Sequence, residues 1–336
     1  FDDIIALVAL YRPGPMSNIP IYNDCKNGLK EPDYIHPTLK EILKPTYGII
    51  IYQEQVMQIA QTLAGFTAGE ADILRRAMGK KKKAELDRQK ERFINGAVKK
   101  GITKDVANYV FTKIEPFAQY GFNKSHAAAY ALIAFQTAYL KTYFKEDFIA
   151  ATMSTELTNT SKLREFVEEL KRLNVEIIRP SLNKCFAEFK AIDRKIYYGL
   201  GAIKNVGYEA ISNIVKEREK NGKFTSFNNF IKRVDPKDVN KLQLEGLTKA
   251  GVFDEFYKDR NKIFTSIPKI IQKIKNMNDD KNTNQSSLFE NNENTENNFE
   301  FLPSTPWKQK ELLSEEFNSL GFFISDHPLN EFKEAF

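Results

Sequence analysis

The chain has 336 residues, of which 42% are hydrophobic, with a formal net charge of +6 and an isoelectric point near 8.9. This length allows two or three domains, each with enough apolar residues for a core. No run approaches the roughly 18 apolar residues of a membrane-spanning helix, no export signal is found, and Cys25 and Cys185 support neither a disulfide framework nor a zinc site. We expect a soluble, multi-domain protein of the reducing cytoplasm, and the first residue, Phe1, suggests a piece of a longer protein.

The first predicted element is an apolar run that stops at a rigid corner. In FDDIIALVALYRPGPM, Pro13 and Pro15 fix φ on both sides of Gly14, so the run ends in a doubly braced turn. We therefore expect a buried segment followed by a sharp change of direction.

Two helices with recognisable ends follow in YGIIIYQEQVMQIAQTLAGFTAGEADILRRAMGKKK. In the first, apolar residues recur at helical spacing from Val56 to Leu63, and Gly65 is placed for a left-handed cap. In the second, Thr67 and Glu70 have the spacing of a capping box, and Gly79 supplies the stop.

Positive charge gathers at the end of the second helix and along a third. From Arg75 to Arg92, nine residues are Lys or Arg and three are acidic. The third helix, predicted from Ala84 to Lys100, is charged on most of its circumference. Ser125 then offers an N-cap for the Ala-rich stretch in NKSHAAAYALIAFQTAYLK, with His126 in the first turn of that helix.

The basic cluster and the NKSH segment form the first candidate site. A guanidinium offers paired donors that match phosphate oxygens, and a capped helix start presents backbone N–H groups to an anion. Arg75, Arg76, Lys80 to Lys83 and the NKSH residues could together hold a polyphosphate. The alternative is a solvated basic helix end and a histidine that caps a helix, because basic residues at a helix C-terminus need no ligand.

The composition changes after the predicted helix in TSKLREFVEELKRL. Short β-like runs and turn residues begin near Asn174, where we place a domain boundary, and helices return from Tyr208. In GLGAIKNVGYEAISNIVKER, Ile203 and Val206 flank a tight turn in the manner of a helix-hairpin-helix, which grips DNA phosphate without reading bases. Asn205 stands where that motif usually has its first glycine.

Two further interpretations of this region stay open. Gly207 could simply open a turn between two packed helices, with no ligand. A second, weaker hairpin is possible at LEGLTKAGVFDEF.

The stretch from about Asn276 to Phe301 is rich in asparagine and lacks the apolar content that offsets the entropy of ordering, so it is predicted to be a linker. It nevertheless contains NQSSLFE, in which Leu288 and Phe289 have no periodic apolar neighbours to bury them. These two residues are either incidental or an anchor for another protein. After the linker, WKQKELLSEEFNSLGFFISDHPL starts another ordered unit.

The sequence shows no complete active site. Two-metal phosphoryl transfer needs clustered carboxylates, and the chain has no D-x-D pattern. The three histidines are widely separated, and no nucleophile stands beside a base in a recognisable arrangement. We therefore expect a chain that binds more than it catalyses.

A resemblance to a known family is carried by four segments: ALVALYRPGPM, YGIIIYQEQVMQIAQTLAGFTAGEADILRRAMGKKK, YGFNKSHAAAYALIAFQTAYLK and GLGAIKNVG. Together they resemble the alpha subunits of bacterial replicative DNA polymerase III, the C-family polymerases. The resemblance covers the chain from Phe1 to about Gly251 and resumes at LLSEEFNSLGFFISDHPL.

The resemblance implies a mainly α fold in four parts. These are a helical fingers domain over residues 1–174, a small helix-hairpin-helix DNA-binding domain over 175–275, a flexible linker with a clamp-binding peptide over 276–305, and over 306–336 a segment that leads toward an OB-fold not included here.

The resemblance also implies a DNA-directed DNA polymerase whose catalytic aspartates lie upstream, in a palm domain. There they hold the Mg²⁺ ions that stabilise charge while a 3′-hydroxyl attacks the α-phosphate of the incoming deoxynucleotide. We expect no catalytic or metal-binding residue in this chain and no polymerisation by the chain alone. The fingers would supply the positive side of the nucleotide pocket.

Two sets of site residues are implied. The set expected near the incoming nucleotide is Arg75, Arg76, Lys80, Asn123, Lys124, Ser125 and His126. The set expected on duplex DNA is Lys81, Lys82, Lys83, Lys204, Asn205 and Gly207. The alternative class is a non-catalytic helix-hairpin-helix DNA-binding or repair scaffold without a nucleotide site.

The family also gives a reason for the isolated apolar pair. Gln285, Leu288 and Phe289 have the spacing Q-x-x-L-F, which resembles the short peptide by which bacterial polymerases hold the ring-shaped β sliding clamp. The implied partners are template-primer DNA, deoxynucleoside triphosphates, the β sliding clamp and, through regions not present here, other replicase subunits. No membrane partner is expected.

Overall fold

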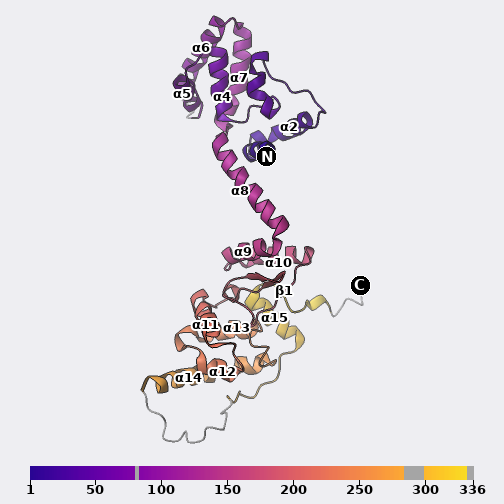
Figure 1. Ribbon diagram of the computed structural model, residues 1–336, viewed down its shortest axis with the longest axis vertical. Helices are drawn as coiled ribbons and strands as arrows, with labels where there is room; N and C mark the ends of the chain where they lie inside the picture. The colour runs from indigo at the N-terminus through magenta and orange to yellow at the C-terminus, as the bar shows by residue number, and fades with distance from the viewer. Residues whose placement is uncertain (80–82, 284–298, 331–336) are drawn as a thin grey trace. The chain divides into compact units, whose positions relative to one another are not determined.

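Fifteen α-helices and one small sheet make up the part of the chain described by the computed structural model, residues 1–79, 83–283 and 299–330 (Figure 1). The mainly α-helical fold predicted from the sequence is confirmed. The chain divides into two compact units, Phe1–Tyr139 and Leu140–Phe336, each described by itself below. None of the described helices combines the length and apolar content that crossing a membrane requires.

The first unit contains eight helices within its described residues. They are α1 (Asp2–Leu10), α2 (Ile19–Lys26), α3 (Lys40–Leu43), α4 (Gln53–Ala64), α5 (Ala68–Gly79), α6 (Lys83–Lys99), α7 (Lys104–Tyr120) and the start of α8 (Lys124–Tyr143). Helices α4, α5, α6 and α7 pack on one another (Figure 1). Their shared core includes the fully buried side chains of Ile59, Leu74, Phe93 and Phe111, and this core fixes where the last turn of α5 lies.

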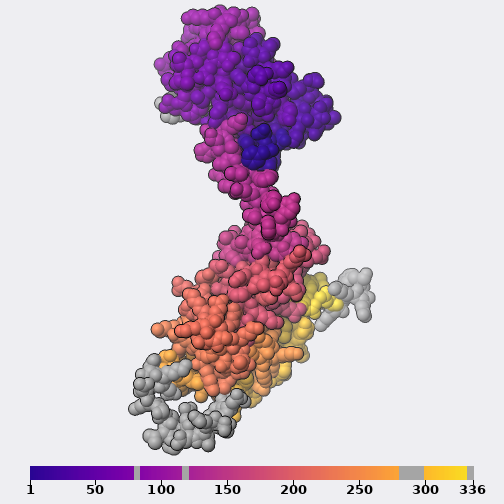
Figure 2. All heavy atoms as spheres, in the orientation of Figure 1, coloured from indigo at the N-terminus to yellow at the C-terminus, as the bar shows by residue number. Residues whose placement is uncertain are grey.

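A smaller cluster joins α1 to the start of α8. Ile5, Ala9 and Leu10 of α1 are buried with Ala127 and Ala131 of α8. The opposite side of α1 is exposed, and the N-terminal residues, in dark indigo, lie on the surface of the first unit (Figure 2). The predicted corner follows, with Gly14 at a φ of 99° between its two prolines.

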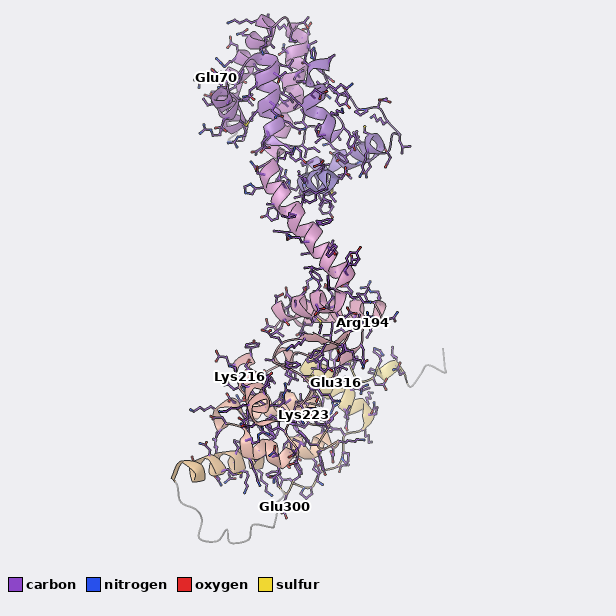
Figure 3. The ribbon with its side chains drawn as sticks, in the orientation of Figure 1. Glu70, Arg194, Lys216, Lys223, Glu300 and Glu316 are labelled. Atoms are coloured by element: carbon purple, nitrogen blue, oxygen red, sulfur yellow. The ribbon has the colours of Figure 1, made fainter. Side chains whose placement is uncertain are left out.

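The helix ends predicted from sequence are confirmed for α4 and α5. Gly65 closes α4 in the left-handed conformation, with a φ of 67°. Thr67 and Glu70 form the capping box of α5: the Thr67 N–H donates to the Glu70 carboxylate at 2.8 Å, and the Glu70 N–H donates to the Thr67 hydroxyl at 3.3 Å (Glu70 is labelled in Figure 3). Helix α6 begins and ends one residue earlier than predicted.

Gly96 allows α6 to approach α4 closely. A Cβ atom at this position would lie 2.1 Å from the carbonyl oxygen of Ala64, a backbone atom that cannot move aside. We predict that Gly96→Ala lowers the free energy of unfolding by about 2 kcal/mol, as overpacking typically does. At Gly69, in α5, the same Cβ meets nothing within 4 Å.

Gly69→Ala is therefore the matched control. Its added methyl enters open space, and we expect it to stabilise the chain by up to about 0.5 kcal/mol through helix propensity. Urea unfolding followed by far-UV circular dichroism measures both variants. Equal unfolding midpoints for the two variants would contradict the close approach of α6 to α4.

The second unit joins helices to a three-stranded sheet. Its elements are α9 (Lys145–Thr155), α10 (Thr160–Arg172), β1 (Ile177–Ile178), β2 (Lys190–Ile192), β3 (Lys195–Tyr197), α11 (Tyr208–Asn221), α12 (Phe227–Arg233), α13 (Lys241–Lys249), α14 (Arg260–Thr283) and α15 (Gln309–Leu320). The strand order is β1-β3-β2, with β1 parallel and β2 antiparallel to β3. Phe224, Phe227, Phe230 and Phe253 pack together in its core.

Both ends of the predicted linker belong to the described structure of the second unit. Helix α14 ends at Thr283, beyond the predicted start of the linker, and Ile263, Ile267, Ile270 and Ile274 bury one side of its earlier turns. On the far side of the undescribed residues, Phe301 stacks on Tyr257 with ring centroids 4.9 Å apart. The linker prediction over 276–305 is thus wrong at both ends, and its middle, with Gln285, Leu288 and Phe289, lies outside the described residues.

Helix α15, in the segment expected to lead toward a further domain, packs onto the second unit. Helix α15 contacts α13. Glu316 of α15, labelled in Figure 3, is 1% exposed. Its carboxylate accepts hydrogen bonds from the backbone N–H groups of Ile324 and Ser325, both at 2.9 Å. The domain division predicted at Asn174 falls inside the second unit and stays a prediction, as does the OB-fold.

Candidate functional site

The first candidate site is built where the N-terminal ends of α4 and α8 meet. A backbone bridge joins Tyr52 to Phe122: the Gln53 N–H donates to the Phe122 carbonyl at 3.0 Å, and the Phe122 N–H donates to the Ile51 carbonyl at 3.1 Å. This pairing brings the first residues of α4 beside the first residues of α8, although 70 positions separate Glu54 from Lys124.

The start of α8 is capped by Asn123, so the N-cap predicted at Ser125 is wrong. The side-chain oxygen of Asn123 accepts from the backbone N–H of His126 at 3.0 Å, and Nδ1 of His126 lies 3.1 Å from the same oxygen. Ser125 is the second residue of the helix. The cap is displaced because the bridge at Phe122 ends the extended backbone two residues earlier than the sequence pattern indicated.

A carboxylate of the chain already lies at this helix start. Both oxygens of Glu54 accept from the backbone N–H of Lys124, at 3.1 and 3.0 Å. A negative charge is favoured there by the unsatisfied N–H groups and the dipole of α8. The side chains of Lys124, Ser125 and His126 are exposed, so the helix start has both a resident anion and an accessible rim.

The two predicted arginines lie at the last turns of α5 and differ in their contacts. Arg75 donates from Nε and Nη2 to Oδ1 of Asp72 at 2.9 and 2.7 Å, and from Nη1 to the side-chain oxygen of Gln53 at 3.3 Å. Arg76 contacts Oδ2 of Asp72 through Nη2 at 2.8 Å. The Arg75 side chain is 33% exposed and that of Arg76 is 57% exposed.

The arginines and the start of α8 lie in one region of the first unit, because both contact the first residues of α4. Gln53 receives the hydrogen bond from Arg75, and its neighbour Glu54 receives that from Lys124. The hydrogen bond from Arg75 holds the pKa of Asp72 below its usual value. The structure therefore gathers four of the predicted residues, Arg75, Asn123, Lys124 and His126, through direct contacts around Gln53 and Glu54.

The four lysines after Arg76 cannot be placed with them. Lys80, Lys81 and Lys82 lie outside the described residues. Lys83 is the first residue of α6, and its side chain also lies outside the described part.

Four residues of this region were missed by the sequence analysis: Arg12, Gln53, Glu54 and Asp72. Arg12 places its guanidinium 4.6 Å from the ring centroid of Phe122, and burial lowers its pKa. Asp72 was visible in the sequence as an acid three and four residues before the arginines, a spacing that pairs side chains on a helix. Arg12, Gln53 and Glu54 gave no such local signal, because their partners lie far along the chain.

The second candidate site is the hairpin between the short 3₁₀ helix Leu200–Ala202 and α11. Ile203 and Val206 are buried, while Lys204, Asn205 and Gly207 are exposed. The Val206 N–H donates to the Ile203 carbonyl at 3.1 Å, which closes the turn.

Asn205 adopts the conformation that the motif requires. Its φ is 63°, in the left-handed region that asparagine tolerates better than other residues with a Cβ. The departure from glycine therefore leaves the turn intact. Gly207 has a φ of −72° and a ψ of 135°, and α11 begins after it without a side-chain cap, so the first N–H groups of this helix point to an uncapped, exposed helix start.

Helices α15 and α13 contact the backbone of the hairpin at Lys204. The Lys204 N–H donates to the Ser319 carbonyl of α15 at 3.0 Å. The Lys204 carbonyl lies 2.6 Å from where a Cβ of Gly246 in α13 would stand, so only glycine allows this approach. These contacts hold the turn rigid from the side opposite its exposed residues.

The weaker second hairpin is filled by a residue of the chain. Gly251 has a φ of 78°, but the guanidinium of Arg260 lies against it and donates to the Lys249 carbonyl at 2.9 Å. Arg260 is 7% exposed and also pairs with Asp254 at 2.6 Å. This turn is a buried structural contact.

Within the described residues, no group of three or more His, Cys, Asp or Glu side chains is arranged to hold a metal ion. Both sites offer cationic side chains, and the second also offers the uncapped N–H groups at the start of α11; these are groups that bind phosphate.

Comparison with known proteins gives two family matches, one in the part of the chain that holds each candidate site. Residues 1–101 match the family described as the bacterial DNA polymerase III alpha subunit finger domain. Residues 174–263 match the helix-hairpin-helix motif family. The first match indicates the class of DNA polymerase polypeptides, and the second indicates a DNA-binding motif within it.

Curated relatives identify the family more closely. The DNA polymerase III subunit alpha of Borreliella burgdorferi is 46% identical over 337 residues, which cover 99% of the chain and 29% of that protein. The subunits of the same name from Caulobacter vibrioides and Rickettsia bellii are 44% and 43% identical, over 98% and 99% of the chain and 29% and 30% of those proteins. The chain belongs to the family of bacterial DNA polymerase III alpha subunits and spans less than a third of the length of these relatives.

Proposed function

We propose that the chain acts as the nucleotide-binding and duplex-binding part of a replicative DNA polymerase. The observation that carries the proposal is the location of Arg76 and Arg75 in the region that matches the finger domain, joined through Gln53 and Glu54 to the start of α8. A guanidinium fork is suited to phosphate oxygens, and the exposed side chains of Lys124, Ser125 and His126 at the start of α8 offer further donors beside it. In this proposal they bind the triphosphate of an incoming deoxynucleotide.

Each group has a distinct task in the nucleotide site. Arg76, the more exposed of the two arginines, binds phosphate directly, while Arg75 is held by Asp72 and Gln53 and shapes the pocket. Lys124, Ser125 and His126 stand at the rim of the α8 start, where Asn123 fixes the first turn. Lys80 to Lys83 add positive charge after α5 for phosphates of nucleotide or DNA.

Chemistry at the α-phosphate is assigned to parts of the polymerase outside this chain. Polymerases of this kind use Mg²⁺ to stabilise the charge that develops during nucleotidyl transfer. The described residues do not fit such ions, since they contain no suitable carboxylate cluster. The residues of this chain bind and orient the triphosphate.

The hairpin is proposed to hold the phosphate backbone of duplex DNA without reading bases. The uncapped start of α11 offers N–H groups, and Lys204 adds a cation beside them. Because Gly207 has extended backbone and a Cβ there would lie 3.5 Å from the nearest atom, of Gln243, valine fits the fold.

We predict that Gly207→Val leaves the unfolding midpoint unchanged and weakens duplex binding about tenfold, because its methyl groups keep phosphate from the N–H groups. Lys204→Ala should weaken binding too and reduce the slope of log affinity against log salt by about 1. Fluorescence anisotropy with two unrelated duplexes measures both effects. A loss confined to one duplex would indicate base reading and contradict the proposal.

The Q-x-x-L-F segment is proposed to bind the β sliding clamp of the same cell. A flexible tether with two apolar anchors raises the local concentration of polymerase at clamp-encircled DNA. Changing both Leu288 and Phe289 to Ala should abolish binding of a peptide of residues 282–290 to the clamp, and equal titration curves for both peptides would contradict this. We also propose that the full-length protein binds other replicase subunits through regions outside this chain, and that it acts in the cytoplasm.

Primer extension distinguishes this function from the alternative of a DNA-binding scaffold. With template-primer DNA, deoxynucleotides and Mg²⁺, the full-length polypeptide is expected to extend primers, and residues 1–336 alone are expected not to. Extension by residues 1–336 would contradict the assignment of catalysis to other parts. A full-length polypeptide that binds duplex DNA but extends no primer would favour the scaffold.

A further inference from the structure

Asp72 occupies a central place between the two arginines of the proposed nucleotide site. Its Oδ1 accepts both hydrogen bonds from Arg75, at 2.9 and 2.7 Å, and its Oδ2 lies 2.8 Å from Nη2 of Arg76. Each carboxylate oxygen therefore serves a different guanidinium. One acidic side chain is the shared counterion of two cations.

The two arginines depend on Asp72 in different ways. Arg75 uses all three of its nitrogens, two on Asp72 and one on Gln53, so its orientation is fixed from two elements. Arg76 reaches Asp72 through one nitrogen and keeps 57% of its side chain exposed. Asp72 thus fixes the first arginine and restrains the second, whose remaining donors face solvent.

Electrostatics explains why a counterion is needed at this place. Arg75 and Arg76 are adjacent, and four lysines follow within seven residues of the second arginine. The two neighbouring guanidiniums repel one another, and without a counterion their long side chains would turn apart in solvent. A carboxylate between the guanidiniums offsets the repulsion and keeps both forks close to the orientation that phosphate oxygens use.

We propose that Asp72 is a positioning residue for the triphosphate: it is the resting counterion of Arg75 and Arg76, and a phosphate of the bound nucleotide takes over its contact with Arg76. This inference rests on the proposed function. When the nucleotide binds, Arg76 exchanges the carboxylate for phosphate, and Arg75 keeps its place through Oδ1 and Gln53. Asp72 therefore has two effects on the nucleotide: it competes with the triphosphate in the free protein and orients Arg75 in the complex.

If Asp72 formed only an ordinary surface ion pair, its removal would have different effects. Pairs three or four residues apart on a helix stabilise it slightly and have no influence on a ligand. Removal of such a carboxylate would lower the melting temperature a little and leave phosphate binding unchanged. The affinity of the protein for a bare polyphosphate distinguishes a counterion of the nucleotide site from an ordinary ion pair. A polyphosphate has no base or sugar, so only its contacts with the cations affect its binding.

The test uses the variants D72N, D72E and E168Q in the full-length polymerase, with inorganic tripolyphosphate as a competitive inhibitor of primer extension. We expect D72N to bind tripolyphosphate about two- to fivefold more tightly, because a screened competing charge is gone. Its kcat should fall while KM for the deoxynucleotide does not rise, because Arg75 loses its orientation. D72E restores the carboxylate and should return two constants, the inhibition constant of tripolyphosphate and kcat, toward those of the unmodified protein.

Glu168→Gln is the matched control. It removes the same charge from an i,i+3 pair, with Lys171 at 2.9 Å on α10 of the second unit, and should change neither constant. Tripolyphosphate inhibition of D72N that is unchanged or weaker would overturn the proposal. Arg76→Ala shows which idea has failed: if it leaves tripolyphosphate inhibition unchanged, the nucleotide site itself is wrong, and if it weakens inhibition while D72N does not strengthen it, only the role of Asp72 is wrong.

Discussion

Replacement of Arg76 by Ala in the full-length polymerase is expected to lower kcat/KM for deoxynucleotides by about 10- to 100-fold, the effect of losing one charge-assisted hydrogen bond to phosphate, about 1.5 to 3 kcal/mol. The reason is structural: Arg76 has the more exposed guanidinium and a single contact to Asp72 in the described structure. Steady-state primer extension on a fixed template-primer measures the change.

Two further variants sharpen this result. Arg75→Ala should also lower kcat/KM, but mainly through kcat, because Arg75 is held by Asp72 and Gln53 and acts on the shape of the pocket. Arg164→Ala, which removes an exposed arginine from α10, is the control and should have no effect. Equal kcat/KM for Arg76→Ala and Arg164→Ala would return Arg76 to ordinary helix-end chemistry.

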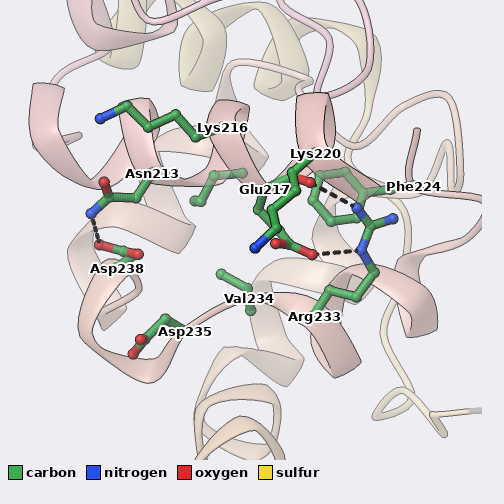
Figure 4. Close-up of a pocket in the computed structure, with 10 residues that line it drawn as sticks. Asn213, Lys216, Glu217, Lys220, Phe224, Arg233, Val234, Asp235 and Asp238 are labelled. Atoms are coloured by element: carbon green, nitrogen blue, oxygen red, sulfur yellow. Dashed lines mark hydrogen bonds and ion pairs between the residues drawn. The ribbon is translucent and has the colours of Figure 1, made fainter. Parts of the chain in front are cut away.

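The largest effect on stability is expected at Arg233, which ties α12 to the C-terminal end of α11 (Figure 4). Its nitrogens donate to the carboxylate and carbonyl of Glu217, at 3.0 and 3.2 Å, and to the carbonyls of Gly222 and Lys223, at 2.9 and 3.3 Å. Its guanidinium lies 4.4 Å from the ring centroid of Phe224. Glu217, Phe224 and Arg233 also line a pocket of about 360 Å³.

Arg233→Met should lower the free energy of unfolding of the second unit by about 3 kcal/mol, because a half-buried carboxylate and three carbonyls lose their donor together. Lys162→Met breaks an exposed ion pair with Glu165 and should cost about 0.5 kcal/mol or less. Trp307, the single tryptophan of the chain, packs on Phe264 in the same unit, so its fluorescence during urea unfolding reports this unit. Similar midpoints for the two variants would show that Arg233 contributes no more than a surface pair.

Local sequence signals predicted the parts of the site that depend on neighbouring residues. Gly65, Thr67 and Glu70 mark helix ends correctly because a cap is formed within one turn of the chain. Asn205, which the sequence pattern predicts at the glycine position of the hairpin, has a left-handed φ of 63°, so the turn accepts it. The spacing of Asp72 to the arginines was equally local but was overlooked.

Other parts were set by contacts between distant segments, which a single sequence does not reveal. The start of α8 was misplaced at Ser125, since both Asn123 and Ser125 have side chains that cap helices and the bridge from Tyr52 decides between them. Glu54 reaches Lys124 for the same reason. The ends of the Asn-rich region were misjudged because Phe301 stacks on Tyr257, far back in the sequence, and because α14 continues to Thr283 despite its polar residues.

The central claim, that Arg76 lies against the triphosphate of the incoming nucleotide, is tested most directly by arginine-specific modification with phenylglyoxal. The full-length polymerase is treated on a chain-terminated template-primer with and without the complementary deoxynucleotide, and the modified residues are quantified by mass spectrometry. We expect Arg76, 57% exposed in the free protein, to be modified without nucleotide and protected by it, while Arg164 reacts equally in both samples. Equal modification of Arg76 with and without saturating nucleotide would contradict the claim.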